Sequence, residues 1–239
     1  MTDAEQPWTQ IPDGWTPPDA TLLEHARDRA LQALSLDGPR PAHQRLRTFY
    51  DTDSDYAGAT FAQLQPLQPA DLTATDLHAT TLLSVRIGPG ATRRLLHDGP
   101  TRTEILGHLR ALPDTQLHVA DTHALLAMQD LYRAIKTALS AATTRTPDAW
   151  VTASKLCARK RPDLYPVRDT RIRDHLGIPT NNNGYATTWL LFRTLIQDHD
   201  LITAIDTAAD AATDGHPRVH LDTSRLRLLD AALWTDTLR

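Results

Sequence analysis

Apolar side chains recur at helical spacing along most of the chain. The clearest stripe runs from Leu125 through Met128, Tyr132 and Ile135 to Leu139, at intervals of three and four residues. Such a stripe lies on one face of an α-helix and is typical of a helix packed against a core. We find no convincing alternation of apolar and polar residues of the kind that indicates strands. The pattern therefore predicts an all-α fold.

Glycine and proline separate the helical segments, as at Gly88-Pro89-Gly90 and Gly99-Pro100. These residues favour turns and end helices, so the pattern predicts about nine or ten helices. The segments with helical spacing are Thr21–Leu34, Ala42–Tyr50, Asp76–Val85, Ala91–His97, Thr103–Leu112, Asp121–Leu139, Pro147–Lys160, a short helix after Asp169, Ala186–Gln197, Leu201–Thr213 and Ser224–Thr235.

The first residues differ in character from the rest. Residues 1–19 are polar and contain four prolines, with Trp8 and Trp15 as large anchors. We expect an N-terminal arm that is either extended over the domain or partly disordered. Residues 20–239 should form a single helical domain, undivided or split into two subdomains with the cleft near residues 150–177.

Length and composition bear on the oligomeric state, the disulfides and the location that we expect. A chain of 239 residues can bury a substantial core without oligomerising, so we expect a monomer. Its single cysteine excludes an intramolecular disulfide. It shows neither a secretion signal at its N-terminus nor an apolar run of membrane-spanning length. We therefore expect a cytoplasmic location and no membrane partner.

Positive charge is concentrated in one segment. Residues 151–175 contain seven Lys or Arg side chains and three Asp, a net charge of +4, although the whole chain carries −4. Grouped cations release counterions when they neutralise phosphates, so the segment indicates a nucleic acid as partner. An ordinary solvated surface explains the same charge equally well.

This segment predicts a two-faced helix. Ala153 and Leu156 share one stripe and should face a core, whereas Lys155 and Arg159 share another and should face a ligand. Pro162 disfavours the helical conformation of the residue before it, so the helix should end near Lys160.

A second, shorter helix should begin at Asp169. Pro166 keeps the connector extended, and Asp169 is a natural N-cap for a helix with Ile172 and Leu176 on its apolar face. Gly177 should end it. Capping is the commoner role of an aspartate at this position, and composition does not separate capping from catalysis.

The run Pro166–Ile172 resembles the catalytic turn of helix-hairpin-helix DNA glycosylases, in which Asp-Thr-His-Val or Asp-Thr-His-Ile follows a connector with Pro and Val. Asp169, Thr170 and Ile172 match their positions, and Arg171 replaces the histidine. The resemblance implies a glycosylase-like helical fold. It also implies that Asp169 is the essential carboxylate and that the substrate is double-stranded DNA with a flipped base.

The sequence departs from that family in several places. Residues 145–150 replace the glycine-rich hairpin that grips a phosphate, so the hairpin is degenerate, and Arg168 separates Val167 from the aspartate. With Cys157 as the only cysteine, no four-cysteine iron–sulfur pattern follows. The family's lyase lysine lies about one turn before Lys155. We therefore favour Lys155 as a phosphate clamp over a Schiff-base nucleophile, which predicts a monofunctional enzyme.

The expected site combines three sets of residues. The catalytic candidates are Asp169 and Lys155. The nucleic-acid-binding candidates are Arg159, Lys160, Arg161, Arg168, Arg171 and Arg173. The candidates for stacking on a base are Tyr50, Tyr56, Trp150 and Tyr165.

No cofactor or metal is expected. Asp51, Asp53 and Asp55 alternate as in a calcium loop, but Tyr56 and Ala62 occupy the positions of its glycine and its bidentate glutamate. Nucleophile elbows, phosphate-binding glycine loops and dinucleotide fingerprints are likewise missing from the sequence.

The whole chain, from Tyr50-Asp51 to Leu228-Leu229-Asp230, also resembles an uncharacterised family found in actinobacteria. The leading interpretation is an N-glycosylase that excises a damaged or modified base, in repair or in defence against phage DNA with modified bases. The alternatives are a nucleic-acid-binding protein without activity and a helical protein-interaction domain.

Overall fold

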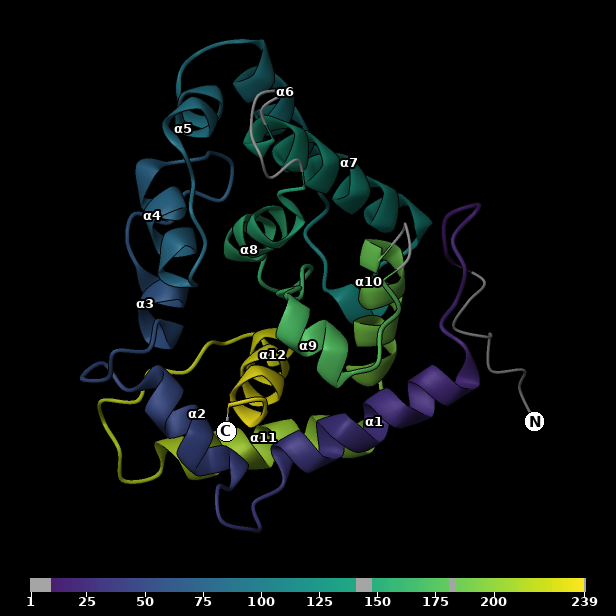
Figure 1. The fold of residues 1–239 in the computed structure, drawn as a ribbon, viewed down its shortest axis with the longest axis vertical. Coiled ribbons are helices and arrows are strands. Elements are labelled where there is room, and N and C mark those ends of the chain that lie inside the picture. Colours follow the sequence, from purple (N-terminus) through teal and green to yellow (C-terminus); the bar gives the residue numbers. More distant parts are fainter. Residues whose placement is uncertain (1–9, 141–147, 181–183, 239) are drawn as a thin grey trace.

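The computed structural model describes residues 10–140, 148–180 and 184–238, and these ranges form twelve α-helices and one 3-10 helix without a strand (Figure 1). In chain order the elements are α1 Ala20–Leu34, α2 Ala42–Tyr50, α3 Gly58–Gln63, α4 Ala74–Leu82, α5 Pro89–Leu96, α6 Pro100–Ala111, η1 Leu117–Val119, α7 Thr122–Leu139, α8 Trp150–Lys160, α9 Thr170–His175, α10 Gly184–Leu195, α11 His199–Thr213 and α12 Arg225–Asp236.

The predicted all-α class is confirmed for the described residues, and each segment with helical spacing contains a helix. All eleven of these segments form helices, which already exceeds the expected nine or ten, and α3 adds a twelfth in the part of the chain that the structure describes. Helix α3 was missed, since its six residues are too few to show a stripe. Helix α8 begins at Trp150, and residues 141–147, which include the predicted start at Pro147 and part of the replaced hairpin, lie outside the described ranges.

Side-chain caps fix where several helices begin. Asp121, Asp169 and Asp198 start α7, α9 and α11, and each accepts a hydrogen bond from the backbone N–H three residues later. Helix α4 begins with a capping box, in which Thr73 and Asp76 each accept a backbone hydrogen bond from the other. These caps satisfy N–H groups that the first helical turn leaves free.

The helices form two groups around a common core. Helices α1, α2, α11 and α12 pack on one another, so that segments from the two ends of the chain lie side by side at the bottom of Figure 1. Helices α4 to α8 form the upper group, with α8 packed between α4 and α7. Helix α9, which follows α8 along the chain, packs on α12, and α3 joins the two groups through its contacts with α2 and α4.

The described part of the N-terminal arm lies on α10. Trp15 makes aromatic contacts with Tyr185 and Trp189, with ring centroids 5.9 Å apart in each case. Such contacts stabilise the arm beyond the apolar area that they bury. Residues 1–9, with Trp8, lie outside the described ranges.

Helix α8 is buried on nearly every side from Ala153 to Lys160, so the predicted ligand-facing stripe does not hold at Arg159. Arg159 and Lys160 are only 5% and 6% exposed and point into the protein. Both approach the fully buried carboxylate of Asp76, Lys160 at 2.8 Å and Arg159 at 3.4 Å. A buried charge must be paired, and this carboxylate supplies the partner for both cations.

The same two cations also hold the segment that follows α3. Arg159 donates to the backbone carbonyls of Phe61, Ala62 and Leu64, and Lys160 donates to that of Gln68. The segment lacks regular helix beyond Gln63, so its carbonyls need donors from elsewhere. The positive charge read from the sequence therefore fixes an internal loop, and Arg159 and Lys160 are not available to DNA phosphates.

We expect Asp76→Asn to lower the free energy of unfolding by about 3–5 kcal/mol, because it leaves two buried cations without a counter-charge while keeping an acceptor for the capping box. Urea unfolding measures this loss. Asp98→Asn is the control, because Asp98 is fully exposed and lies 3.9 Å from Arg102. Equal losses in both variants would contradict the anchoring role of Asp76.

Candidate functional site

The two groups of helices enclose a cleft of about 490 Å³ next to α8. Its lining residues come from the end of α2 and the loop after it, the end of α4, α8, the connector to α9, α9 itself, and α12. Ligand pockets in proteins span about 300–1,000 Å³, so the cleft can hold a small molecule or one nucleotide unit.

Asp169 and Lys155, the two predicted catalytic residues, both line this cleft. Asp169 is 9% exposed, and its Oδ1 accepts a hydrogen bond of 2.9 Å from the backbone N–H of Ile172. Its carboxylate therefore caps α9 and also borders the cleft. Capping with one oxygen leaves the other able to interact with a ligand, so both roles suggested by the sequence are compatible.

Lys155 reaches the cleft from the middle of α8 and is 7% exposed. Its Nζ donates a hydrogen bond of 2.7 Å to the carbonyl oxygen of Leu83, at the end of α4. Burial lowers the pKa of Lys155, whereas the nearby charge of Asp169 raises it and that of Arg227 lowers it further. The enclosed position does not favour a clamp on an exposed DNA phosphate.

Two charged residues of α12, Arg227 and Asp230, complete the polar part of the cleft. They form a salt bridge of 3.0 Å and are 4% and 2% exposed. Sequence reasoning missed both. The only available signal is a pair of opposite charges three residues apart on a helix rich in leucine and alanine, which more often marks an exposed surface pair.

Asp230 links α12 to the connector that carries Asp169. Its Oδ2 accepts a hydrogen bond of 2.7 Å from the backbone N–H of Val167, two residues before Asp169. Its Oδ1 is buried and has no hydrogen-bond partner among the described residues. Burial raises the pKa of Asp230 to about 7, although Arg227 and the Val167 N–H lower it, and the charge of Asp169 adds to the increase.

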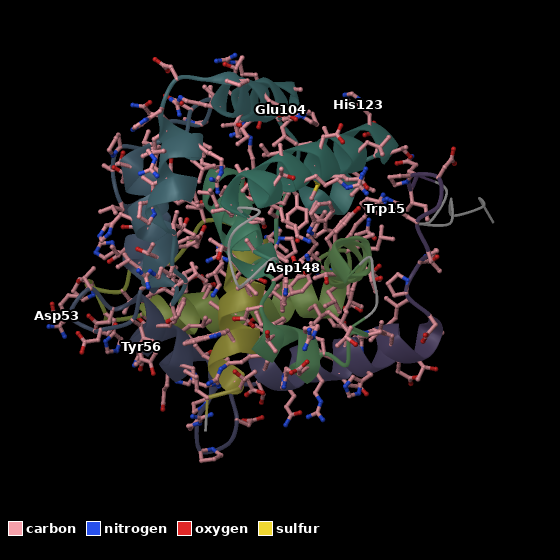
Figure 2. All side chains as sticks on the ribbon, turned by 45° about the horizontal axis from the view of Figure 1, so that its top comes forward. Trp15, Asp53, Tyr56, Glu104, His123 and Asp148 are labelled. Carbon is pink, nitrogen blue, oxygen red and sulfur yellow. The ribbon has the colours of Figure 1, made fainter. Side chains whose placement is uncertain are left out.

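An aromatic wall borders the cleft. Phe49, Tyr56 and Trp234 line it, and their ring centroids lie 5.5 to 6.2 Å apart. Tyr56 is 41% exposed and lies on the loop after α2, where Figure 2 labels it. Of the residues predicted to stack on a base, Tyr56 is therefore placed where a planar ligand could reach it.

The structure gives the other predicted base contacts different positions. Tyr50 is fully buried, and Tyr165 is 1% exposed and donates to the carbonyl of Met128. Both belong to the core, so their assignment to a base pocket was wrong. The guanidinium groups of Arg168 and Arg173 lie over the ring of Trp150, with their Cζ atoms 5.1 and 5.9 Å from the ring centroid.

Two more predicted phosphate contacts are engaged inside the protein. Arg161 donates to the carbonyls of Pro69 and Leu109. Arg168 donates to the hydroxyls of Tyr132 and Thr188. These bonds hold both half-buried guanidinium groups against the protein, and their contact with DNA stays a prediction.

Two of the predicted cations keep positions outside the core. Arg171 is exposed and lines the cleft, and Arg173 is half-buried on α9 and pairs with Asp174 at 2.7 Å. The basic segment thus contributes one exposed cation, Arg171, to the border of the cleft.

No group of three or more His, Cys, Asp or Glu is placed to hold a metal ion within the described ranges. In the same part of the chain, no helix has the length and apolar character needed to cross a bilayer.

These features define an all-α protein with a ligand-sized cleft that combines buried charges and an aromatic wall. The chain belongs to the Family of unknown function (DUF6308), whose model matches residues 42–237. The matched region contains every residue that lines the cleft. No curated protein and no solved structure matches the chain significantly.

The raised pKa of Asp230 predicts a pH-dependent stability. Between about pH 4 and pH 7 the unfolded chain ionises this carboxyl while the folded protein keeps it protonated, so its contribution to the free energy of unfolding falls by up to about 1.4 kcal/mol per pH unit. We expect wild type to lose stability relative to Asp230→Asn across this range. Urea unfolding at a series of pH values measures the difference, and a pH-independent difference would contradict the raised pKa.

Proposed function

We propose that the protein is a DNA N-glycosylase that binds one extruded nucleotide in the cleft and hydrolyses its glycosidic bond. The observation that supports this is the meeting, in one cleft, of the Asp169 carboxylate with the aromatic wall of Phe49, Tyr56 and Trp234. A base can stack on such a wall while a carboxylate faces its sugar. The resemblance of residues 166–172 to the catalytic turn of DNA glycosylases independently selects Asp169.

The chemistry follows from the charge of Asp169. As the bond between C1′ and the base nitrogen breaks, its electron pair leaves with the base and the sugar becomes cationic. A carboxylate beside C1′ stabilises that cation, and water then adds its oxygen to C1′ while one water proton ends on the departing base. Because the connector and the cap hold Asp169 in place, little reorganisation is needed during the reaction.

The remaining cations take supporting roles in this proposal. Arg171, exposed beside the cleft, contacts a phosphate next to the extruded nucleotide. Lys155 orients the end of α4 through Leu83 and places a positive charge near Asp169. We propose a monofunctional enzyme, because a lysine held in this way is poorly suited to attack C1′.

The substrate base is damaged or modified, and the biological role is repair or defence against phage DNA with modified bases. Unstacking costs least for a base that is mismatched, damaged or already single-stranded, which itself contributes selectivity. The burial of Lys155, Arg159 and Lys160 predicts modest affinity for ordinary duplex DNA, since fewer phosphates can be neutralised.

We expect Asp169→Asn to reduce base release by at least about 10²-fold, because asparagine still caps α9 but does not stabilise a cation. DNA affinity should stay equal or improve, since the change removes a negative charge near phosphate. Incubation with genomic DNA from hosts and from phages with modified bases tests this, with released bases scored by mass spectrometry.

The matched control is Asp174→Asn, which removes an exposed carboxylate from the same helix and should leave base release unchanged. Retained excision by Asp169→Asn would refute the assignment of the catalytic residue. Salt-sensitive binding by wild type without base release would favour a non-catalytic nucleic-acid-binding protein. Stable association with another protein and weak DNA affinity would favour an interaction domain.

The aromatic wall predicts a separate effect on binding. Tyr56→Ala should weaken binding of the substrate by about 1–3 kcal/mol, because it removes one stacking surface, whereas Tyr56→Phe should bind as wild type does. Fluorescence anisotropy with an oligonucleotide that contains the substrate base measures both. A larger loss in Tyr56→Phe than in Tyr56→Ala would assign the contribution to the hydroxyl and not to stacking.

A further inference from the structure

The lining of the cleft includes the carboxylate of Asp230, to which neither the family match nor the resemblance gives a role. Asp230 is 2% exposed, lines the cleft, and has one oxygen without a hydrogen-bond partner among the described residues. A buried carboxylate oxygen without a partner is costly, and a catalytic role is one reason for which native proteins keep such a group.

The two carboxylate oxygens of Asp230 differ in their hydrogen bonding. Oδ2 is held by the Val167 N–H at 2.7 Å and by Arg227 at 3.0 Å. These two bonds fix the side chain and leave Oδ1 free of both. Because Val167 lies in the connector to Asp169, the two carboxylates keep a defined position relative to each other on the walls of the cleft.

We propose that Asp230 is a second catalytic carboxylate, the base that takes a proton from the attacking water during hydrolysis. The inference rests on the proposed N-glycosylase function. The water oxygen bonds to C1′ as the bond to the base breaks, and one water proton passes to Oδ1 of Asp230. The departing base keeps the electron pair of the broken bond and then receives that proton, which restores the carboxylate of Asp230.

The charges around Asp230 suit this role. Arg227 on the same helix is the charged group paired with Asp230. Asp222 pairs with Arg227 and not with Asp230, and Tyr50 on α2 lies near Arg227 and Asp222. Asp169 faces it from the connector, and Lys155 on α8 interacts with Asp169 and Arg227. With a pKa of about 7, Asp230 is divided between acid and base forms at neutral pH, where a general base is most effective.

Two carboxylates with different environments then have different tasks. In this proposal Asp169 faces the sugar and acts through its negative charge, whereas Asp230, the more buried of the two, exchanges a proton. Pairs of acidic groups whose surroundings separate their pKa values divide acid–base work in other hydrolytic enzymes in the same way.

The test compares Asp230→Asn with Asp222→Asn under single-turnover conditions, with base release measured from pH 5.5 to 8.5. Asp222 also pairs with Arg227, at 3.6 Å, but lines a different groove, so it controls for loss of a charge beside Arg227. We expect wild-type base release to rise through about pH 7. Asp230→Asn should lose at least about 10²-fold in rate and the pH dependence near 7, whereas Asp222→Asn should keep both.

Asp230→Glu serves as the conservative variant, because it retains a carboxylate. Partial activity with the same rise in rate is expected for Asp230→Glu. A wild-type rate that does not change with pH overturns the proposal even if Asp230→Asn fails to fold. Equal loss in Asp230→Asn and Asp222→Asn, with an unchanged pH profile, overturns it in favour of a structural role.

The test also separates this inference from the proposed function. Base release that depends on Asp169 but not on Asp230 refutes the role of Asp230 as a general base and still supports the N-glycosylase function. Failure of wild type to release any base refutes the glycosylase, and the role of Asp230 as its base with it.

Discussion

The fold depends on the burial of α8 together with its cations. A charge that is removed from water must find a counter-charge and hydrogen-bond partners within the protein. Arg159 and Lys160 find them in Asp76 and in the carbonyls after α3, which ties α4 and that loop to α8. This anchoring holds one side of the helix, and Lys155 and the connector to Asp169 take their positions from it.

The cleft forms where this anchored group meets helices from the two ends of the chain. Helix α12 contributes Asp230, which binds the connector through Val167, and Trp234, which joins Phe49 in the aromatic wall. One helix thus supplies both a charged group and part of the stacking surface. A change in the packing of α12 on α2 or α9 would therefore alter the position of Asp169 as well as the shape of the cleft.

Sequence reasoning found some elements of the site for sound physical reasons. Asp169 was recognisable because N-caps follow a local rule, and Tyr56 because an aromatic residue in a polar loop has little core to enter. It missed Asp230 and Arg227, whose partners lie on segments distant in sequence. It misplaced Arg159 and Lys160 because arginine and lysine are usually exposed, and nothing in the local sequence indicates a buried counter-charge at Asp76.

By itself the sequence determined the class of fold and most helix positions, because apolar spacing, caps, glycine and proline act within a few residues. It also marked the turn at Asp169. Only the tertiary structure decided which charges face water and which face one another, since burial depends on segments brought together from distant parts of the chain. For that reason the apparent cationic surface became an internal anchor, and a cleft with Asp169, Lys155 and Asp230 took its place as the candidate site.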